Sequence, residues 1–400
     1  DFIHGPDQTP STSKALYFNG TLHPTDAWSI NAGIRQSWDR KDYTYFRSNP
    51  DGTVPGPLPC AFFLGAPTAG PTGIGNAPNC LLLGLYNVTG LFEGKRTDWR
   101  IETDYRISPE FFVYGSVATG YKGGGVNPRP FFPDQLKTFD SEELTSYELG
   151  WKSDLFDNTL RLNVAGFFTQ YDNIQLVLKQ CEVPVFVDPD LIGPPCLKPA
   201  NVGDAEIKGV EVEATWYLTD DFLVDVSAST LDFQYVTVDP LAFSSIEIAP
   251  LDMITPYTPE DKWSLGAQYS FPETGLGRFL VRVDGSYTSD IYTDPANRSV
   301  NQIDGYTLVN AVLRWDAPDD AWRIEAQLLN LTDEVYYIDA YDVHDSQGTV
   351  LMQPGLPMTW NLSFQRNFGA AFFDVDKTIL ARNSGRLYLQ ELYERGAAEG

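Results

Sequence analysis

The sequence predicts an all-β protein: an antiparallel transmembrane β-barrel fragment of about 13 strands, followed by a short strand-loop-helix tail. Three observations support this prediction. Apolar and polar residues alternate through most strand candidates, short and long links alternate between them, and aromatic residues gather at their ends. We therefore divide the chain into a barrel part, residues 1-368, and a tail, residues 369-400.

Composition favours strands and turns over helices. Aromatic residues make up 14% of the chain, and there are 33 Gly and 28 Pro. The net charge of -26 argues against nucleic acid as a partner, because phosphate backbones are bound by basic patches. No window holds about eighteen uncharged apolar residues, which excludes a membrane-spanning helix. The chain begins with Asp1 and shows no signal peptide, so we expect a processed or partial chain.

Period-2 alternation marks the strand candidates in chain order. Those that we bound are Lys14 to Leu22, Trp28 to Asp39, Lys95 to Tyr105, Phe111 to Lys122, Glu142 to Ser153, Thr159 to Val177, Glu206 to Tyr217, Trp263 to Phe271, Tyr306 to Trp315 and Thr359 to Phe368. The short links are HPTDA, ISPE, DLFDN, LTDD, PETGLG and DAPDD. The long links are roughly 40-94, 123-141, 178-205, 239-260, 291-304 and 339-358.

This alternation of links orients the chain. Outer-membrane barrels have short periplasmic turns and longer external loops, whereas a soluble sandwich or propeller has no reason to place every long loop on one side. The short links are therefore expected to be periplasmic, and the last strand is expected to end at the periplasmic face.

The side-chain faces of the strand TLRLNVAGFFTQY suit lipid on one side and water on the other. Leu160, Leu162 and Val164 share one face with Phe168, while Arg161 shares the other with polar residues. An Arg or Lys on the lipid side at mid-membrane costs about 2–4 kcal/mol, so such sorting is required. A soluble antiparallel sheet with one wet face remains an alternative, but it explains the faces and not the links.

Tryptophans stand where strand ends are expected to meet the membrane interfaces. Tyr and Trp prefer the headgroup level because part of the ring is apolar and part can form hydrogen bonds. The residues in question are Trp28, Trp38, Trp151, Trp216, Trp263, Trp315, Trp322 and Trp360.

Several segments together resemble the barrel of TonB-dependent outer-membrane receptors. They are VYGSVATGYKGGGVNPRPF, SYELGWKSDLFDNTLRLNVAGFFTQYDNIQ, AEIKGVEVEATWYLTDDF and LLNLTDEVYY. The resemblance covers about residues 10 to 368 and implies a receptor in the outer membrane of a Gram-negative bacterium, for active uptake of a scarce nutrient such as a ferric siderophore. It further implies three kinds of partner: outer-membrane lipid and lipopolysaccharide, the ferric chelate or a similar small ligand, and the TonB energising complex.

Receptors of this family have 22 strands around an N-terminal plug, and the TonB motif precedes the plug. Neither the plug nor that motif falls within this sequence, so we expect the last thirteen or so strands of a larger receptor, or a truncated product that does not transport. The sequence leaves the nutrient open. A passive porin or adhesin is an alternative function.

The four cysteines form two pairs, each within one long external link. In an oxidising envelope we expect disulfides Cys60 to Cys80 and Cys181 to Cys196. Metal binding is the competing interpretation, but none of the three histidines, His4, His23 and His344, lies beside a cysteine pair. We therefore expect no metal site and no cofactor.

Aromatic and basic residues in the external links are candidate ligand contacts, since the resembling receptors hold metal chelates with such residues. They are Tyr43, Tyr45, Phe46, Arg129, Phe131, Phe132 and Tyr341. Packing of these aromatic residues on one another is the alternative interpretation.

The tail AAFFDVDKTILARNSGRLYLQELYERG resembles the first motif of haloacid-dehalogenase-like phosphatases. The resemblance assigns Asp374 as nucleophile and Asp376 as general acid/base, with Thr378 nearby. The later Ser/Thr, Lys and Mg²⁺ ligands of that family do not follow, so we expect the tail to be catalytically silent and the chain not to be an enzyme. A phosphatase fusion or fragment is the alternative.

Overall fold

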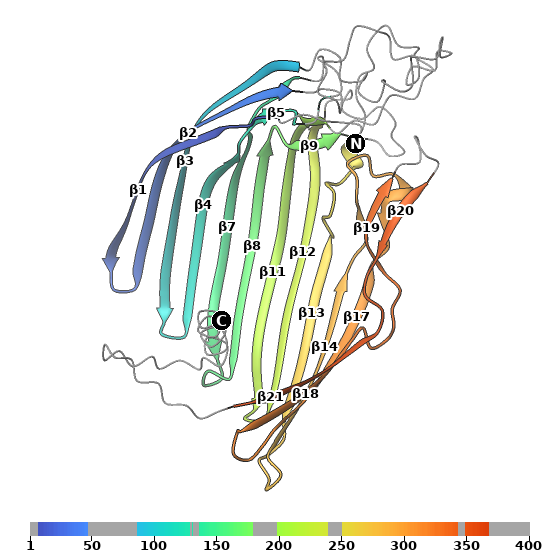
Figure 1. Cartoon of the computed structure of the whole chain (residues 1–400). Coiled ribbons are helices and arrows are strands. Elements are labelled where there is room, and N and C mark those ends of the chain that lie inside the picture. The colour runs from blue at the N-terminus through green and yellow to red at the C-terminus, as the bar shows by residue number, and fades with distance from the viewer. Residues whose placement is uncertain are drawn as a thin grey trace, which may run out of the picture.

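A computed structural model of the chain describes residues 7–46, 86–128, 130, 136–178, 198–238, 250–342 and 349–367. Its main element is one 13-stranded sheet in which each strand is hydrogen-bonded, antiparallel, to the next long strand along the chain (Figure 1). The expected antiparallel all-β architecture of about thirteen strands is confirmed.

The sheet is built from thirteen long strands. They are β1 (Ser11–Thr25), β2 (Trp28–Phe46), β3 (Tyr86–Ser108), β4 (Phe111–Lys122), β7 (Glu142–Leu155), β8 (Leu160–Asp172), β11 (Gly203–Thr219), β12 (Phe222–Val238), β13 (Asp261–Ser270), β14 (Arg278–Thr288), β17 (Tyr306–Asp316), β18 (Trp322–Leu329) and β21 (Thr359–Arg366).

In the described parts of the long links there are four two-stranded pieces and two 3₁₀ turns. The pairs are β5 (Gly125–Val126) with β6 (Thr138–Phe139), β9 (Gln175–Leu178) with β10 (Lys198–Asn201), β15 (Ile291–Tyr292) with β16 (Gln302–Ile303), and β19 (Tyr337–Asp342) with β20 (Val350–Pro354); the turns are η4 (Pro250–Asp252) and η5 (Ser299–Asn301).

The two ends of the sheet differ as the alternation of links predicts. Figure 1 shows the tight turns between hairpin strands at the lower end of the sheet and β5, β9, β19 and β20 at the upper end. Two-residue turns such as Asp26-Ala27 close the lower end, and the described parts of the longer links lie at the upper end. We call these the turn end and the loop end.

The predicted strand from Thr159 to Val177 is two elements in the structure. Strand β8 ends at Asp172, and Asn173 adopts a left-handed backbone with φ 57° before β9 begins. Asn tolerates this conformation because its short side chain forms local hydrogen bonds. Its main-chain N–H donates to Asp204 at 3.0 Å, which turns the chain away from the sheet.

Two apolar clusters cover the sheet at the loop end. One joins residues of β9, β11 and β12 to the segment around η4 and includes Ile174, Val202, Phe233, Tyr235 and Met253. The second is smaller and consists of the buried side chains of Tyr45, Phe92 and Val126. Both lie on one face of the sheet, which we call the inner face, and the opposite face is the outer face.

Within the described residues, β1 and β21 are the edges of the sheet, and each pairs with one neighbour. No helix in this part of the chain is long and apolar enough to cross a membrane. The tail, with Asp374, Asp376 and Thr378, lies outside the described residues, and so do Phe368 and the four cysteines.

Candidate functional site

The outer face carries a continuous row of apolar residues. Strand register places seven apolar residues side by side across seven strands: Trp216, Val224, Ala267, Val283, Ala311, Leu328 and Trp360. Large members of the row are exposed, with 43% of Val283 and 72% of Trp360 accessible. Exposure of such a surface to water is unfavourable, whereas contact with lipid acyl chains is not. The tryptophans at both ends of the row are suited to the two membrane–water interfaces.

The inner face is polar at the same height. The row beside the one just described runs through Thr215, Asp225, Gly266, Asp284 and Asn310. Arg282, on the same face, contacts both acids: its Nη1 lies 2.7 Å from Asp225, and its Nη2 lies 2.5 Å from Asp284. The change from apolar to charged residues between adjacent rows is what a wall between lipid and water requires.

Glycines on the inner face let large side chains lie flat on the wall. Tyr114 covers Gly150 on the neighbouring strand, and a Cβ added to Gly150 would lie 2.7 Å from both the Tyr114 hydroxyl and the Val164 carbonyl oxygen. In this position the hydroxyl of Tyr114 donates to Glu148 at 2.6 Å. The bare glycine therefore allows an aromatic ring and a carboxylate to be fixed on the lumen side.

Two further glycines act in the same way. Phe167 covers Gly209, where an added Cβ would lie 2.7 Å from the ring and 2.5 Å from a main-chain oxygen. The pair of Arg282 and Asp225 covers Gly266. These contacts join β4 to β7, β8 to β11, and β14 to β12 across β13, so they tie neighbouring strands in addition to the backbone ladder.

Carboxylates dominate the middle of the inner face. Register places Glu102 and Glu148 in one row and Asp104 and Glu211 in the next. Of these four carboxylates, Glu102 alone forms an ion pair with another described residue, Arg100. The wall at this level therefore presents negative charge to the space that it faces.

At the loop end, a glycine-rich segment packs on the inner face of β2 and β3. Lys41 donates through Nζ to the carbonyl oxygen of Gly124 at 2.7 Å, and Tyr45 donates to that of Asn127 at 2.5 Å. Val126 packs so closely on Gly90 that an added Cβ there would lie 2.8 Å from its methyl group. We call the run Gly123 to Asn127 the strap. Within it, a Cβ added to Gly124 would lie 2.2 Å from the carbonyl oxygen of Phe139, so that position requires glycine.

The candidate ligand residues that the structure describes differ in accessibility. Tyr45 is 1% exposed beneath the strap and stacks on Tyr43 at 6.3 Å between ring centroids. Phe46 makes an edge contact with Tyr86 at 5.9 Å, and Tyr341 on β19 is 46% exposed. The structure brings Tyr43, Tyr45 and Phe46 together and places Tyr341 on a separate hairpin. Arg129, Phe131 and Phe132 lie outside the described residues.

The long links on the β12–β21 side are fastened to one another. Thr293 donates to the carbonyl oxygen of Ala340 at 2.6 Å, and Tyr257 donates to Asp339 at 2.7 Å. Partial burial, together with this hydrogen bond, raises the pKa of Tyr257 to about 12. The hairpin β19–β20 is thus held by side chains from two other links.

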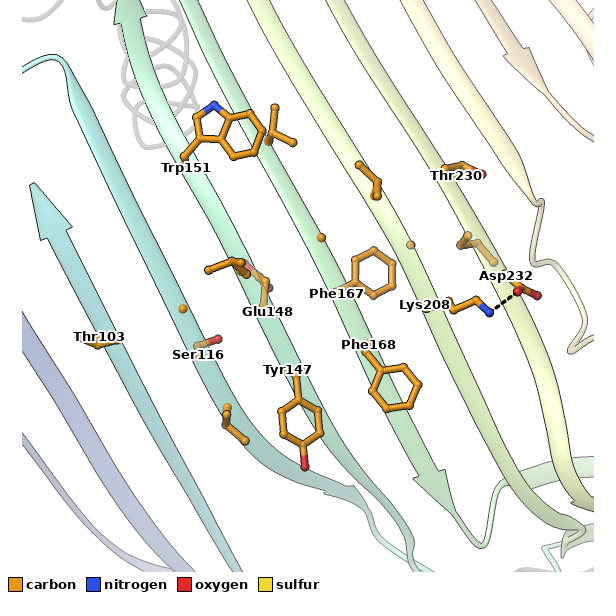
Figure 2. A pocket seen from close by; sticks show the side chains of 18 of the residues that line it. Thr103, Ser116, Tyr147, Glu148, Trp151, Phe167, Phe168, Lys208, Thr230 and Asp232 are labelled. Carbon is orange, nitrogen blue, oxygen red and sulfur yellow. Dashed lines mark ion pairs between the residues drawn. The ribbon is translucent and has the colours of Figure 1, made fainter. Parts of the chain in front are cut away.

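An apolar hollow shown in Figure 2 belongs to the outer face. Tyr147 and Phe168 line it with Lys208, which pairs with Asp232 at 2.9 Å. Register places these residues in one row of the outer face. A lipid-facing hollow suits an acyl chain, so we do not assign the nutrient to it. No group of metal-ligating side chains occurs in the parts of the chain described above.

Sequence reasoning missed the covered glycines and the strap. The motif ELGW contained Gly150, AEIKGVEVEATWYLTDDF contained Gly209, and YKGGGVN contained the strap, but only strand register shows which side chain each glycine faces.

Comparison with known families gives a match that spans most of the chain. The family model described as "TonB dependent receptor-like, beta-barrel" matches residues 4–331. The pesticin receptor of Yersinia pestis is 23% identical over 341 residues, which cover 85% of this chain and 42% of that protein. A probable TonB-dependent siderophore receptor of Acinetobacter baumannii, PiuA, is 24% identical over 58% of this chain and 29% of its own length.

Solved structures show the same fold. The ferric yersiniabactin uptake receptor FyuA from Yersinia pestis superposes with a TM-score of 0.69 at 21% identity, covering 92% of this chain and 47% of that one. The siderophore receptor PiuA from Acinetobacter baumannii gives a TM-score of 0.62 at 17% identity, over 90% of this chain and 43% of its own. The chain thus spans less than half the length of these relatives, which are receptors.

Proposed function

Because the chain belongs to the TonB-dependent receptor-like β-barrel family, we propose that it forms the C-terminal part of a receptor for active uptake of a scarce nutrient such as a ferric siderophore. Barrels of this family are outer-membrane proteins of Gram-negative bacteria, which places the chain in that membrane. The observation that carries the proposal is the 13-stranded meander with an apolar outer face and a charged inner face.

The names of the relatives support the nutrient class. They include a siderophore receptor and a ferric yersiniabactin uptake receptor, although each name applies to that protein alone. These relatives give no support to a phosphatase or to a passive porin. We propose that the chain is not an enzyme and that its tail is a silent extension.

We propose that the ligand contacts Tyr43, Phe46 and Tyr341 at the loop end. The hydroxyl of Tyr43 lies beside Gly125 of the strap, and Arg129 comes two residues after the strap in the sequence. Tyr45 holds the strap in place through its hydroxyl, so its contribution is support for this surface. Aromatic rings and a guanidinium group suit an anionic metal chelate, which has both flat and charged parts.

We also propose that the inner wall receives a plug domain supplied by the rest of the receptor, through which the TonB complex acts. Glu148 and Glu211 face the lumen in adjacent rows, and the hydroxyl of Tyr114 fixes Glu148. Carboxylates held on a wall favour a partner surface with Lys or Arg, because a like-charged or apolar surface would leave them desolvated without compensation.

Uptake of a radiolabelled ferric siderophore tests the function. The full-length receptor is expressed in a strain that lacks its own receptors, with and without TonB. We expect accumulation that requires both the receptor and TonB. Equal accumulation without TonB would indicate passive diffusion and contradict the proposal. A panel of catecholate, hydroxamate and citrate chelates identifies the class.

Sensitivity to a large antibiotic that the outer membrane normally excludes tests the plug contact. Glu148→Gln with Glu211→Gln is expected to increase sensitivity, because the wall then loses its charges toward the plug. Glu206→Gln is the matched control, since Glu206 lies on the outer face and contacts Gln170 at 3.2 Å. Unchanged sensitivity in the double variant would contradict this contact.

A further inference from the structure

Two lysines flank a tryptophan on the outer face of β1, β2 and β3, the strands that form one edge of the sheet (Figure 1). Lys14 pairs with Trp38, and Trp38 pairs with Lys95. Because neighbouring strands lie about 4.8 Å apart, the two lysine backbones are about 10 Å apart. Long flexible side chains from both positions can therefore reach one anion above the indole ring.

The position of this row along the strands matches a membrane interface. Two rows nearer the turn end, Phe18, Ile34 and Trp99 form an apolar row with 73%, 51% and 40% of their surfaces exposed. In the row between, Thr97 donates to Gln36 at 2.6 Å. Going from this apolar row toward the loop end, the lysines are thus the first charged residues on the outer face of these strands. They lie beside Trp38, and tryptophan prefers the headgroup level.

The two lysines have no carboxylate partner in the part of the chain that the structure describes. The nearest acid on the same face is Glu93, and Arg40 already contacts it at 2.5 Å. Arg40 also engages Asp42, at 2.7 Å. By contrast Lys208, another lysine of the outer face, is paired with Asp232. The charges of Lys14 and Lys95 are therefore not neutralised within the described chain and are available to an external anion.

We propose that Lys14 and Lys95 bind a phosphate group of a lipid headgroup in the outer leaflet, with Trp38 between the headgroup and the acyl chains. The phosphates of lipopolysaccharide have this chemistry. The inference rests on the outer-membrane location of the family and not on the nutrient. Loss of the site would leave the uptake test above unaffected.

Binding of lipid A to the purified full-length receptor tests this site. The probes are bisphosphorylated lipid A and its dephosphorylated form, presented in the same detergent. Each lysine near an anionic lipid surface contributes about fivefold in affinity, so the variant with Lys14→Gln and Lys95→Gln is expected to bind the phosphorylated lipid about 25-fold more weakly. Lys208→Gln is the matched control and is expected to bind like the unaltered receptor.

Three results would overturn the proposal. The double variant could bind the phosphorylated lipid as tightly as the unaltered receptor does, or it could lose affinity equally for the phosphorylated and the dephosphorylated lipid. Inorganic phosphate could also compete at a concentration near that of the lipid. The last result would indicate a site for a soluble anion.

Two further measurements separate loss of charge from misfolding and test whether binding is electrostatic. The variant with Lys14→Arg and Lys95→Arg retains the charges and is expected to retain binding. For the unaltered receptor, binding of the phosphorylated lipid is expected to weaken as NaCl rises, because salt screens exposed charges, while binding of the dephosphorylated lipid stays constant. Salt-independent binding would also overturn the proposal.

Discussion

Replacing Gly150 by alanine is expected to destabilise the barrel, although alanine normally suits a strand better than glycine. The added Cβ would lie 2.7 Å from the hydroxyl of Tyr114 and 2.7 Å from the main-chain oxygen of Val164. Real Cβ atoms do not approach oxygen so closely, so the ring and the backbone must both move. Movement of the ring breaks the hydrogen bond to Glu148.

The magnitude of this effect follows from three contributions. Overpacking of this kind costs about 1–3 kcal/mol. Loss of a hydrogen bond to a carboxylate costs about 1.5–3 kcal/mol, and alanine regains about 0.5–1 kcal/mol of backbone entropy. The net loss is therefore about 2–5 kcal/mol. Gly166→Ala is the matched control, because only one atom, at 3.9 Å, lies near an added Cβ there.

The assay is urea unfolding of the full-length receptor in detergent, followed by tryptophan fluorescence. Gly166→Ala should be neutral or slightly stabilising, and Gly150→Ala should lower the unfolding midpoint. In a Tyr114→Ala background the cost of Gly150→Ala should shrink, since one of the two close oxygen contacts disappears. Equal midpoints for the two alanine variants, or an undiminished cost in the Tyr114→Ala background, would refute the role of this glycine.

Four further predictions concern other parts of the chain. Arg282→Ala removes the partner of Asp225 and is expected to lower stability by about 1–3 kcal/mol in the same unfolding assay, whereas Arg282→Lys should retain part of it. The raised pKa of Tyr257 means that its contact is fully present below about pH 10 and is lost as pH rises toward about 12; the tyrosinate absorbance of the receptor minus that of its Tyr257→Phe variant should show this late titration. Non-reduced peptide mapping should find each cysteine pair bridged within its own link, and free thiols or cross-link pairing would contradict this. The tail should hydrolyse no aryl phosphate with Mg²⁺; an activity that Asp374→Asn abolishes would overturn that prediction.

The sequence predicted the strands and their faces because both depend on local patterns. Leu160, Leu162 and Val164 do share the outer face, as their alternation indicated. Phe167 did not fit that pattern, because it is apolar and lies on the inner face. Phe167 covers Gly209 on the next strand. The register between two strands cannot be predicted from the sequence of either strand alone.

The site was less predictable because it depends on long-range packing. Tyr45 is a residue type that often contacts ligands. In the structure it is buried by the strap, which lies more than 70 residues further along the chain, and its hydroxyl donates to Asn127 across a separation of 82 residues. Residue type indicates what a side chain can bind. Whether that side chain is accessible depends on segments that a single sequence does not place in space.

The strands differ greatly in length, and this gives the barrel a slanted rim. Strand β3 has 23 residues, whereas β18 and β21 have 8 each. At about 3.3 Å per residue and a tilt of about 40°, β3 rises roughly 55 Å and β18 roughly 20 Å, against an apolar band about 25 Å tall.

One side of the mouth is therefore a tall continuous sheet, held along its length by a ladder of backbone hydrogen bonds. On the low side the missing height is supplied by the hairpin β19–β20, which is fastened by contacts such as the one from Thr293 to Ala340. A hairpin held by a few side chains can swing as a unit. Movement at the loop end is thus expected on the low side rather than at the tall wall.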